Sequence, residues 1–150
     1  MSAKLRLAIN GYGRIGRCFL RALYESSACE QFEIVAINEP ADLDSMAYLT
    51  RFDSTHGVFP GEVSQGEQSL IINGHSIAVT HADKPEAVDW GAYKLDVLIE
   101  CSGRYSSRRE LMRFIEAGCP RLLLSQPADG ASEVDQTIVY GINQQVLQGD

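Results

Sequence analysis

The sequence predicts an α/β fold, in which a doubly wound, mostly parallel sheet carries an inserted antiparallel hairpin. Three observations lead to this prediction. Short apolar runs alternate with segments of helical periodicity along the 150 residues. The first apolar run leads through a glycine-rich turn into a helix. One Asn-Gly pair stands between two strand-like runs. Alternating strands and helices favour a parallel sheet with helices on both faces.

The first third of the chain predicts one βαβ unit. The apolar run Leu5–Ile9 has the length of a strand and stops at a glycine-rich turn. From Ile15 onward, apolar residues repeat at helical spacing until the pattern fades near Ser26. Phe32–Ile37 (FEIVAI) then predicts a buried strand, so we expect a right-handed crossover between the two strands.

The later elements also alternate between strands and helices, except for one predicted antiparallel hairpin. A second helix is expected over Asp44–Phe52, with Asp42 or Asp44 as its N-cap. The hairpin is predicted from two strands, Gln68–Ile72 and His75–Thr80, which flank Asn73-Gly74. Three more strands and one helix complete the prediction: strands at Val97–Ile99, Arg121–Leu124 and Thr137–Tyr140, and a helix over Arg108–Ala117 ended by Gly118.

The composition indicates one globular domain over residues 1–150. Hydrophobic residues make up 45% and charged residues 22% of the sequence. The formal net charge of −7 argues against a nucleic-acid-binding surface, which needs a basic footprint. A small anionic ligand is still possible, because backbone N–H groups can hold it.

The cysteines and the N-terminus indicate a cytoplasmic protein. Cys18, Cys29, Cys101 and Cys119 form no C-x-x-C pair and no cluster with zinc spacing, so we expect reduced thiols and no metal site. The N-terminal residues reach a glycine motif before any long apolar stretch, so neither a signal peptide nor a membrane span is expected.

The glycine motif predicts a Rossmann-type, dinucleotide-binding version of the fold. Residues 11–16 (GYGRIG) fit G-x-G-x-x-G between a strand and a helix. In this context Gly11 permits the tight turn, Gly13 lets a pyrophosphate approach the backbone, and Gly16 lets the helix pack on the strand. The free N–H groups near Arg14 and Ile15 would point at the phosphates. The alternative is an ordinary strand–helix turn with incidental glycines.

Polar residues at the ends of other strands extend this predicted site. Glu39 ends the second strand, where an acid can accept hydrogen bonds from both ribose hydroxyls of an adenosine. Its alternative is a solvated loop carboxylate or a helix cap. Cys101-Ser102-Gly103 and Ser125 follow later strands, and ligands lie beyond such carboxyl ends. We expect the backbone of Cys101-Ser102-Gly103 to pack against the cofactor and the Ser125 hydroxyl to lie near the nicotinamide. For both, the alternative is an ordinary turn at the end of a strand.

A hydrolytic Ser/His/Asp site is not favoured by the sequence. Asp53, Ser54 and His56 lie together in one polar loop that has no nucleophile elbow and no oxyanion element, so a turn is the better interpretation.

Several stretches closely resemble the glyceraldehyde-3-phosphate dehydrogenase family, over essentially the whole chain. They are AINGYGRIGR (8–17), VAINEP (35–40), FDSTHGVFPGEV (52–63), LIECSGRY (98–105) and VYGIN (139–143). The resemblance implies that this is the family's NAD-binding domain. It places the Arg14 and Ile15 backbone on the pyrophosphate, Glu39 on the ribose and Ser125 near the nicotinamide. One departure is Asp83, where the family usually has an arginine beside the adenine. The residues expected to bind NAD are Asn10, Gly11, Gly13, Arg14, Ile15, Gly16, Asn38, Glu39, Asp83, Cys101, Ser102, Gly103, Tyr105 and Ser125.

The resemblance also implies an activity for the full-length protein. Details such as ALYES (22–26), Glu39 and CSGRYSSRR (101–109) are similar to the D-erythrose-4-phosphate dehydrogenase branch. That branch oxidises D-erythrose 4-phosphate to 4-phospho-D-erythronate, a step toward pyridoxal phosphate. The alternative within the family is glycolytic glyceraldehyde-3-phosphate dehydrogenase.

The family's catalytic cysteine, in a motif resembling S-x-A-S-C-T-T, is expected beyond residue 150, together with the rest of the catalytic domain. We therefore expect these 150 residues to be inactive alone, to pack against the catalytic domain, and to form a homotetramer when full-length. The alternative from another class is a stand-alone nucleotide-binding module without catalysis. NAD is expected rather than NADP, because Glu39 would repel the extra phosphate of NADP. Arg104 or a lysine could offset this repulsion only by reaching the 2′ position, and the sequence places no basic residue beside Glu39.

Overall fold

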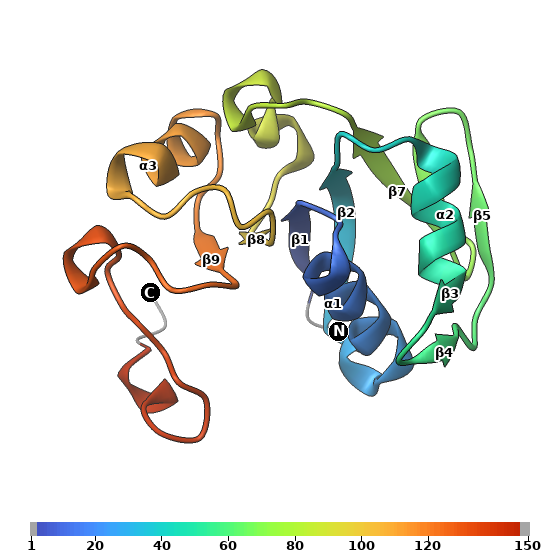
Figure 1. The fold of residues 1–150 in the computed structure, drawn as a ribbon, viewed down its shortest axis with the longest axis horizontal. Coiled ribbons are helices and arrows are strands. Elements are labelled where there is room, and N and C mark those ends of the chain that lie inside the picture. Colours follow the sequence, from blue (N-terminus) through green and yellow to red (C-terminus); the bar gives the residue numbers. More distant parts are fainter. Residues whose placement is uncertain (1–2, 148–150) are drawn as a thin grey trace.

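The computed structural model describes residues 3–147 as a seven-stranded sheet with helices on both faces (Figure 1). The strands of this sheet are β1 Leu5–Asn10, β2 Phe32–Asn38, β5 Val63–Gln65, β6 Ser69–Ile72, β7 His75–Thr80, β8 Val97–Glu100 and β9 Leu122–Leu124. Two short strands, β3 Phe52–Asp53 and β4 Gly57–Val58, pair with each other outside it. The α-helices are α1 Arg14–Glu25, α2 Leu43–Arg51 and α3 Arg108–Glu116. Short 3-10 helices lie at Ser27–Glu30, Pro85–Ala87, Trp90–Tyr93, Ala131–Glu133 and Gln144–Val146.

The strand order confirms the predicted doubly wound fold. Across the sheet the order is β5-β6-β7-β2-β1-β8-β9, and the five strands from β7 to β9 are parallel. After β1 and β2 the chain passes to the far edge at β5, comes back through β6 to β7, and then crosses to the other side of β1 as β8 and β9. The order therefore reverses between β1 and β8, and open α/β sheets bind ligands at such a switch point.

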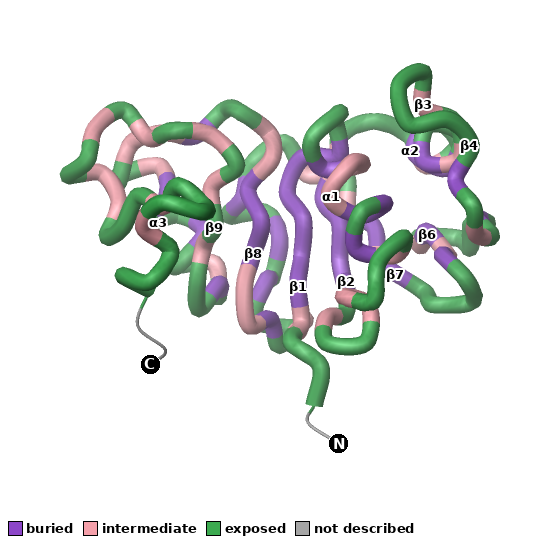
Figure 2. The backbone as a smooth tube through the Cα atoms, turned by 90° about the horizontal axis from the view of Figure 1, so that it is seen from below, coloured by how far each residue is buried: buried purple, intermediate pink, exposed green. Residues whose placement is uncertain are grey.

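Side-chain alternation in the central strand sends apolar residues to both faces of the sheet. Leu7 and Ile9 belong to one core, which also contains residues of α1 and α2. Ala8 belongs to a second core with Trp90 and, from α3, Phe114. The central strands are accordingly the most buried part of the backbone (Figure 2). Such burial on both faces is typical of parallel strands.

The pairing of β1 with β2 contains a β-bulge that the sequence pattern did not reveal. Leu7 pairs with Ile34, but the next residue, Ala8, pairs with Ala36, so Val35 is an extra residue in β2. As a result Val35 and Ala36 both face the α3 side of the sheet, while Ile34 faces the α1 side.

Most predicted elements are present, within a residue or two of their expected ends. Asp42 is the N-cap of α2, because its side chain accepts a hydrogen bond from the N–H of Ser45 at 2.8 Å. The Asn73-Gly74 hairpin joins β6 and β7. Its second strand, β7, also pairs in parallel with β2, so β7 joins the hairpin to the parallel part of the sheet.

One predicted strand is wrong, and three short strands were not predicted. Within residues 3–147, Thr137–Tyr140 forms no strand, and Tyr140 is 91% exposed. The segment after β9 extends away from the sheet (Figure 1), so this apolar run does not lie along the free edge of β9 where it could form backbone hydrogen bonds. The unpredicted strands β3, β4 and β5 have only two or three residues each, too few for a periodic signal. No helix in the described part of the chain is long and apolar enough to cross a membrane.

Candidate functional site

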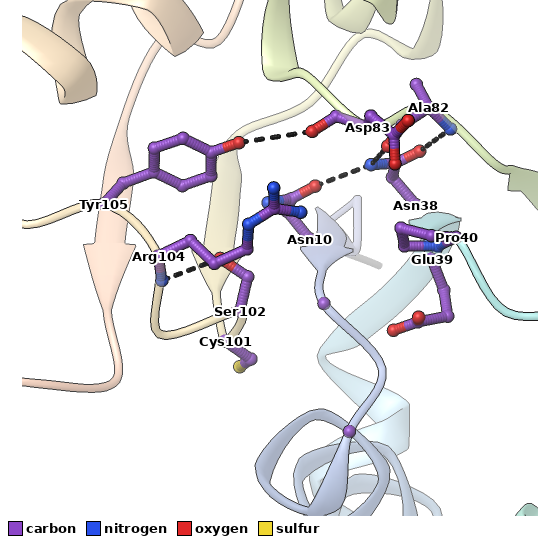
Figure 3. A pocket seen from close by; sticks show the side chains of 12 residues that line it. Asn10, Asn38, Glu39, Pro40, Ala82, Asp83, Cys101, Ser102, Arg104 and Tyr105 are labelled. Atoms are coloured by element: carbon purple, nitrogen blue, oxygen red, sulfur yellow. Dashed lines mark hydrogen bonds between the residues drawn. The ribbon is translucent and has the colours of Figure 1, made fainter.

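A pocket opens at the carboxyl ends of the parallel strands, at the switch point between β1 and β8 (Figure 3). Segments that follow β1, β2, β7 and β8 contribute to its walls. The residues that line it are Asn10, Gly11, Gly13, Asn38, Glu39, Pro40, Ala82, Asp83, Cys101, Ser102, Arg104 and Tyr105.

Each of the three motif glycines is glycine for a different structural reason. Gly11 has φ +88°, and a Cβ there would lie 2.5 Å from the backbone nitrogen of Ser102. A Cβ on Gly16 would collide with the carbonyl oxygen of Gly11, so helix α1 packs closely on the turn. Gly13 is different, because a Cβ there would have no protein atom within 4 Å. Gly11 and Gly16 are therefore required by the fold. Gly13 is not, but its lack of a side chain leaves space in the pocket next to the backbone.

Glu39 stands at one wall of the pocket with its carboxylate fixed by backbone groups. One carboxylate oxygen accepts the N–H of Tyr12, inside the glycine motif, at 2.6 Å. The other accepts the N–H of Ala41 at 3.1 Å. A carboxylate has about four lone-pair sites, so two acceptor positions remain for a ligand.

A buried hydrogen-bond network joins the strand ends beneath the pocket. The amide nitrogen of Asn10 donates to Glu100 at 2.7 Å, and the amide nitrogen of Asn38 donates to the side-chain oxygen of Asn10 at 2.8 Å. The side-chain oxygen of Asn38 then accepts the Thr80 hydroxyl at 2.7 Å and the N–H of Ala82 at 2.9 Å. The network thus connects the ends of β8, β1, β2 and β7.

Glu100 is the charged end of this network, and its side chain is fully buried. Besides the Asn10 amide, the carboxylate accepts the backbone N–H of Ser102 at 2.6 Å. Burial raises the pKa of Glu100, while hydrogen bonds from Ser102 and Asn10 act in the opposite direction.

The loop after β8 forms the wall opposite Glu39. Burial raises the pKa of the Cys101 thiol to about 11, so at neutral pH this residue is a thiol and not a thiolate. Gly103 turns the loop with φ +71°. Tyr105 packs edge-on against Phe114 of α3, with 5.2 Å between the ring centroids.

Arg104, in the same loop, was not among the residues expected to bind NAD. Its side chain extends into the pocket that Glu39 also lines (Figure 3). Among residues 3–147, no hydrogen bond or ion pair engages its guanidinium. The pocket therefore combines a fixed carboxylate with an available guanidinium.

The structure brings most of the expected cofactor residues into this pocket. Those that line it are Asn10, Gly11, Gly13, Asn38, Glu39, Asp83, Cys101, Ser102 and Tyr105. The other expected residues lie outside its lining: Arg14, Ile15, Gly16, Gly103 and Ser125.

Three of those outlying residues have other surroundings. The Arg14 side chain turns away to Asp53, at 3.7 Å. Ile15 is 55% exposed on the first turn of α1. Ser125, just after β9, hydrogen-bonds to the thiol of Cys101, which places it beside the pocket wall.

Sequence reasoning missed Pro40, Ala82 and Arg104 in the lining and Glu100 beneath it. A signal for Glu100 was present, because a charged residue ends an otherwise apolar strand where Asn10 and Asn38 end the neighbouring ones. Pro40, Ala82 and Arg104 are ordinary loop residues without such a signal.

The polar loop at residues 53–57 is a turn, not a hydrolytic site. One carboxylate oxygen of Asp53 accepts the backbone N–H groups of Thr55 and His56, both at 2.8 Å. These bonds lower the pKa of Asp53 and are those of an Asx-type turn.

Comparison with known proteins agrees with this geometry. Residues 5–108 match the model of the family described as "Glyceraldehyde 3-phosphate dehydrogenase, NAD binding domain". The chain is also 42% identical over 144 residues to a protein of Pseudomonas aeruginosa named glyceraldehyde-3-phosphate dehydrogenase. That alignment covers 96% of this chain and 42% of the relative, so the chain spans less than half the relative's length. The chain therefore belongs to the glyceraldehyde-3-phosphate dehydrogenase family and contains its NAD-binding domain, with NAD as the cofactor.

Proposed function

We propose that the pocket at the β1–β8 switch point binds NAD, with the adenosine ribose at Glu39. The observation that carries this proposal is the Glu39 carboxylate, which two backbone N–H groups hold at the pocket wall. Its remaining acceptor sites suit the two hydroxyls of a ribose. The residues proposed to surround the adenosine are Asn10, Gly11, Asn38, Asp83, Cys101, Ser102, Gly103 and Tyr105.

The proposed phosphate position is above Gly13 and the first turn of α1. Gly13 leaves open space where any side chain would stand, so a pyrophosphate can approach the backbone. The helix contributes the N–H groups of Arg14 and Ile15, which precede the first intrahelical bonds, and its N-terminus favours an anion. Gly16 has an indirect role, because it lets α1 begin this close to the turn. Ser125, beside Cys101, is proposed to lie near the nicotinamide end.

We further propose that the chain serves an NAD-dependent oxidation of a phosphorylated aldose. Bound NAD would accept a hydride, and this domain would hold the cofactor in position. The features similar to the erythrose-4-phosphate branch favour D-erythrose 4-phosphate, oxidised to 4-phospho-D-erythronate in pyridoxine biosynthesis. The name of the Pseudomonas aeruginosa relative favours a second candidate, glyceraldehyde 3-phosphate. A cytoplasmic homotetramer is part of the same proposal for the full-length enzyme.

Calorimetry with NAD and NADP tests the assignment of Glu39. A carboxylate at the ribose would repel the extra phosphate of NADP, so we expect the chain to bind NAD at least about tenfold more tightly. Glu39→Ala should lower NAD affinity and reduce this preference. Glu116→Ala, an exposed change in α3, is the matched control and should alter neither value. Equal affinities in the wild type, or an unchanged preference in Glu39→Ala, would show that Glu39 does not face the ribose.

A further inference from the structure

We propose that Glu100 is a positioning residue of the dinucleotide site, because its carboxylate fixes the direction of the buried hydrogen-bond network beneath the pocket. The network consists of Glu100, Asn10, Asn38, Thr80 and Ala82, with Ser102 bonded to the other carboxylate oxygen. The proposal rests on the proposed function, since it concerns how the NAD pocket keeps its shape.

The direction of the network follows from the chemistry of a carboxylate, which only accepts hydrogen bonds when ionised. Asn10 must therefore turn its NH2 group to Glu100, which leaves its oxygen to face Asn38. Asn38 must donate to the Asn10 oxygen through its own NH2 group, so the side-chain oxygen of Asn38 faces the N–H of Ala82. Its amide nitrogen also donates to the carbonyl oxygen of Ala82, at 3.0 Å. One acidic group thus sets the orientation of two buried amides and of the loop after β7.

The other carboxylate oxygen holds the loop on the opposite side of the pocket. It accepts the N–H of Ser102 at 2.6 Å, where that loop passes closest to Gly11. Ser102 and Ala82 both line the pocket, on segments that follow different strands. Glu100 therefore links two walls of the proposed site without lining it.

Glutamine has nearly the shape of glutamate but cannot replace it in this network. Its NH2 group would face one of two donors, the amide of Asn10 or the N–H of Ser102. If both asparagines turned over to avoid the first conflict, the N–H of Ala82 would lose its acceptor. In every arrangement one donor is unsatisfied, and unsatisfied buried donors are costly.

A second substitution can remove the conflict. In Asn10→Asp/Glu100→Gln, the new carboxylate accepts from the glutamine NH2 group on one side and from Asn38 on the other. The glutamine oxygen then accepts the N–H of Ser102, so every bond of the network is restored. The net charge of the pair is unchanged, and only the position of the charge moves.

The test is a four-variant series measured with NAD by calorimetry and by thermal unfolding. We expect Glu100→Gln to bind NAD about tenfold more weakly than the wild type or worse, the scale of a lost hydrogen bond to a charged group. Asn10 itself lines the pocket, so its variants are compared by thermal unfolding. Asn10→Asp alone should lower the melting temperature, since it places two carboxylates in contact. Asn10→Asp/Glu100→Gln should melt higher than Glu100→Gln and near the wild type, and the exposed control Glu116→Gln should match the wild type in both measurements.

The outcomes separate this proposal from the proposed function. No NAD binding by the wild-type chain would overturn the proposed function, and this proposal with it. NAD binding by the wild type with unchanged affinity in Glu100→Gln would overturn this proposal alone, as would a double variant that melts no higher than Glu100→Gln. If Glu100→Gln does not fold, a double variant that folds supports the proposal, and one that also fails to fold overturns it.

Discussion

At the scale of single residues, the pocket is lined by one carboxylate that hydrogen bonds hold in place and one guanidinium that they do not, those of Glu39 and Arg104. Glu39 is fixed by the N–H groups of Tyr12 and Ala41, whereas the guanidinium of Arg104 has no partner among residues 3–147. A fixed carboxylate repels the extra phosphate of NADP and so discriminates against that nucleotide. A guanidinium without a partner can move toward the same phosphate and bind it. The two residues therefore act in opposite directions on the choice between NAD and NADP.

Arg104→Ala should sharpen the preference for NAD over NADP. The guanidinium can offset part of the repulsion between Glu39 and the extra phosphate, so its removal should weaken NADP binding more than NAD binding, by about threefold to tenfold. Calorimetry with both nucleotides measures the ratio. Arg109→Ala, an exposed change on α3 outside the pocket lining, is the control. An unchanged ratio would mean that Arg104 does not reach the nucleotide's ribose end.

Gly11→Ala and Gly13→Ala should separate folding from binding. Gly11 has φ +88° and would place its Cβ 2.5 Å from Ser102, so Gly11→Ala should lower the melting temperature by several degrees. Gly13 has φ −72° and open space around its Cβ position, so Gly13→Ala should melt near the wild type. Its methyl group would nevertheless stand where the pyrophosphate is proposed to approach, and NAD affinity should fall at least about tenfold. Wild-type affinity in Gly13→Ala would contradict that phosphate position.

At the scale of elements, local signals were sufficient where the sequence contains a complete motif. The strand, glycine turn and helix of residues 5–25 were predicted because periodicity and turn chemistry agree there. Thr137–Tyr140 has the composition of a strand, but composition alone cannot supply a neighbour to pair with. The bulge at Val35 also depends on register between two strands, which no local pattern records.

The candidate site divides in the same way. Glycines and strand-end polar residues predicted parts of both walls, whereas Arg104 and Ala82 enter the pocket only because their loops cross it in three dimensions. The acidic end of the buried network was visible in the sequence as Glu100. Its partners could be identified only once the strand order placed β1 between β2 and β8.

The cap of α2 gives a prediction about pH. The Asp42 carboxylate accepts the N–H and the hydroxyl of Ser45, and these bonds lower its pKa. A lowered folded-state pKa means that the stabilisation is complete above the unfolded value, near 3.8, and is lost as pH falls through the folded value. Asp42→Asn keeps a capping oxygen but does not titrate. Urea unfolding between pH 5 and pH 2 should therefore show the wild type losing stability relative to Asp42→Asn. A constant difference across this range would contradict the prediction.

At the scale of the whole molecule, the sheet is well packed but some apolar side chains are not. Tyr140 and Ile142, in the segment after β9, are 91% and 72% exposed, and this segment extends away from the sheet (Figure 1). Tyr48 of α2, Phe52 of β3 and Val58 of β4 are exposed as well. Exposed apolar groups of this kind commonly mark surfaces that pack against further protein. They are compatible with a domain that spans 42% of its relative's length.

The 150-residue chain should bind NAD yet produce no NADH from an aldehyde. Aldehyde oxidation in this family is expected to need a cysteine thiolate, and a thiolate needs a base or a lowered pKa. Burial instead raises the pKa of Cys101 to about 11 and that of Cys119 to about 12. Within residues 3–147, no hydrogen bond joins a cysteine to a histidine, the most common activating base of a catalytic thiol.

NADH formation should be followed by absorbance with D-erythrose 4-phosphate and, separately, with glyceraldehyde 3-phosphate plus phosphate. The full-length Pseudomonas aeruginosa relative in the same buffer provides the active control for glyceraldehyde 3-phosphate. We expect the signal from this chain to equal that of buffer alone, and Cys101→Ser to leave it unchanged. Turnover that persists through purification and disappears in Cys101→Ser would mean that the cofactor pocket itself contains a nucleophile. In that case the raised pKa of Cys101 would have to fall on NAD binding, because a buried thiol at about pKa 11 is almost entirely protonated at neutral pH.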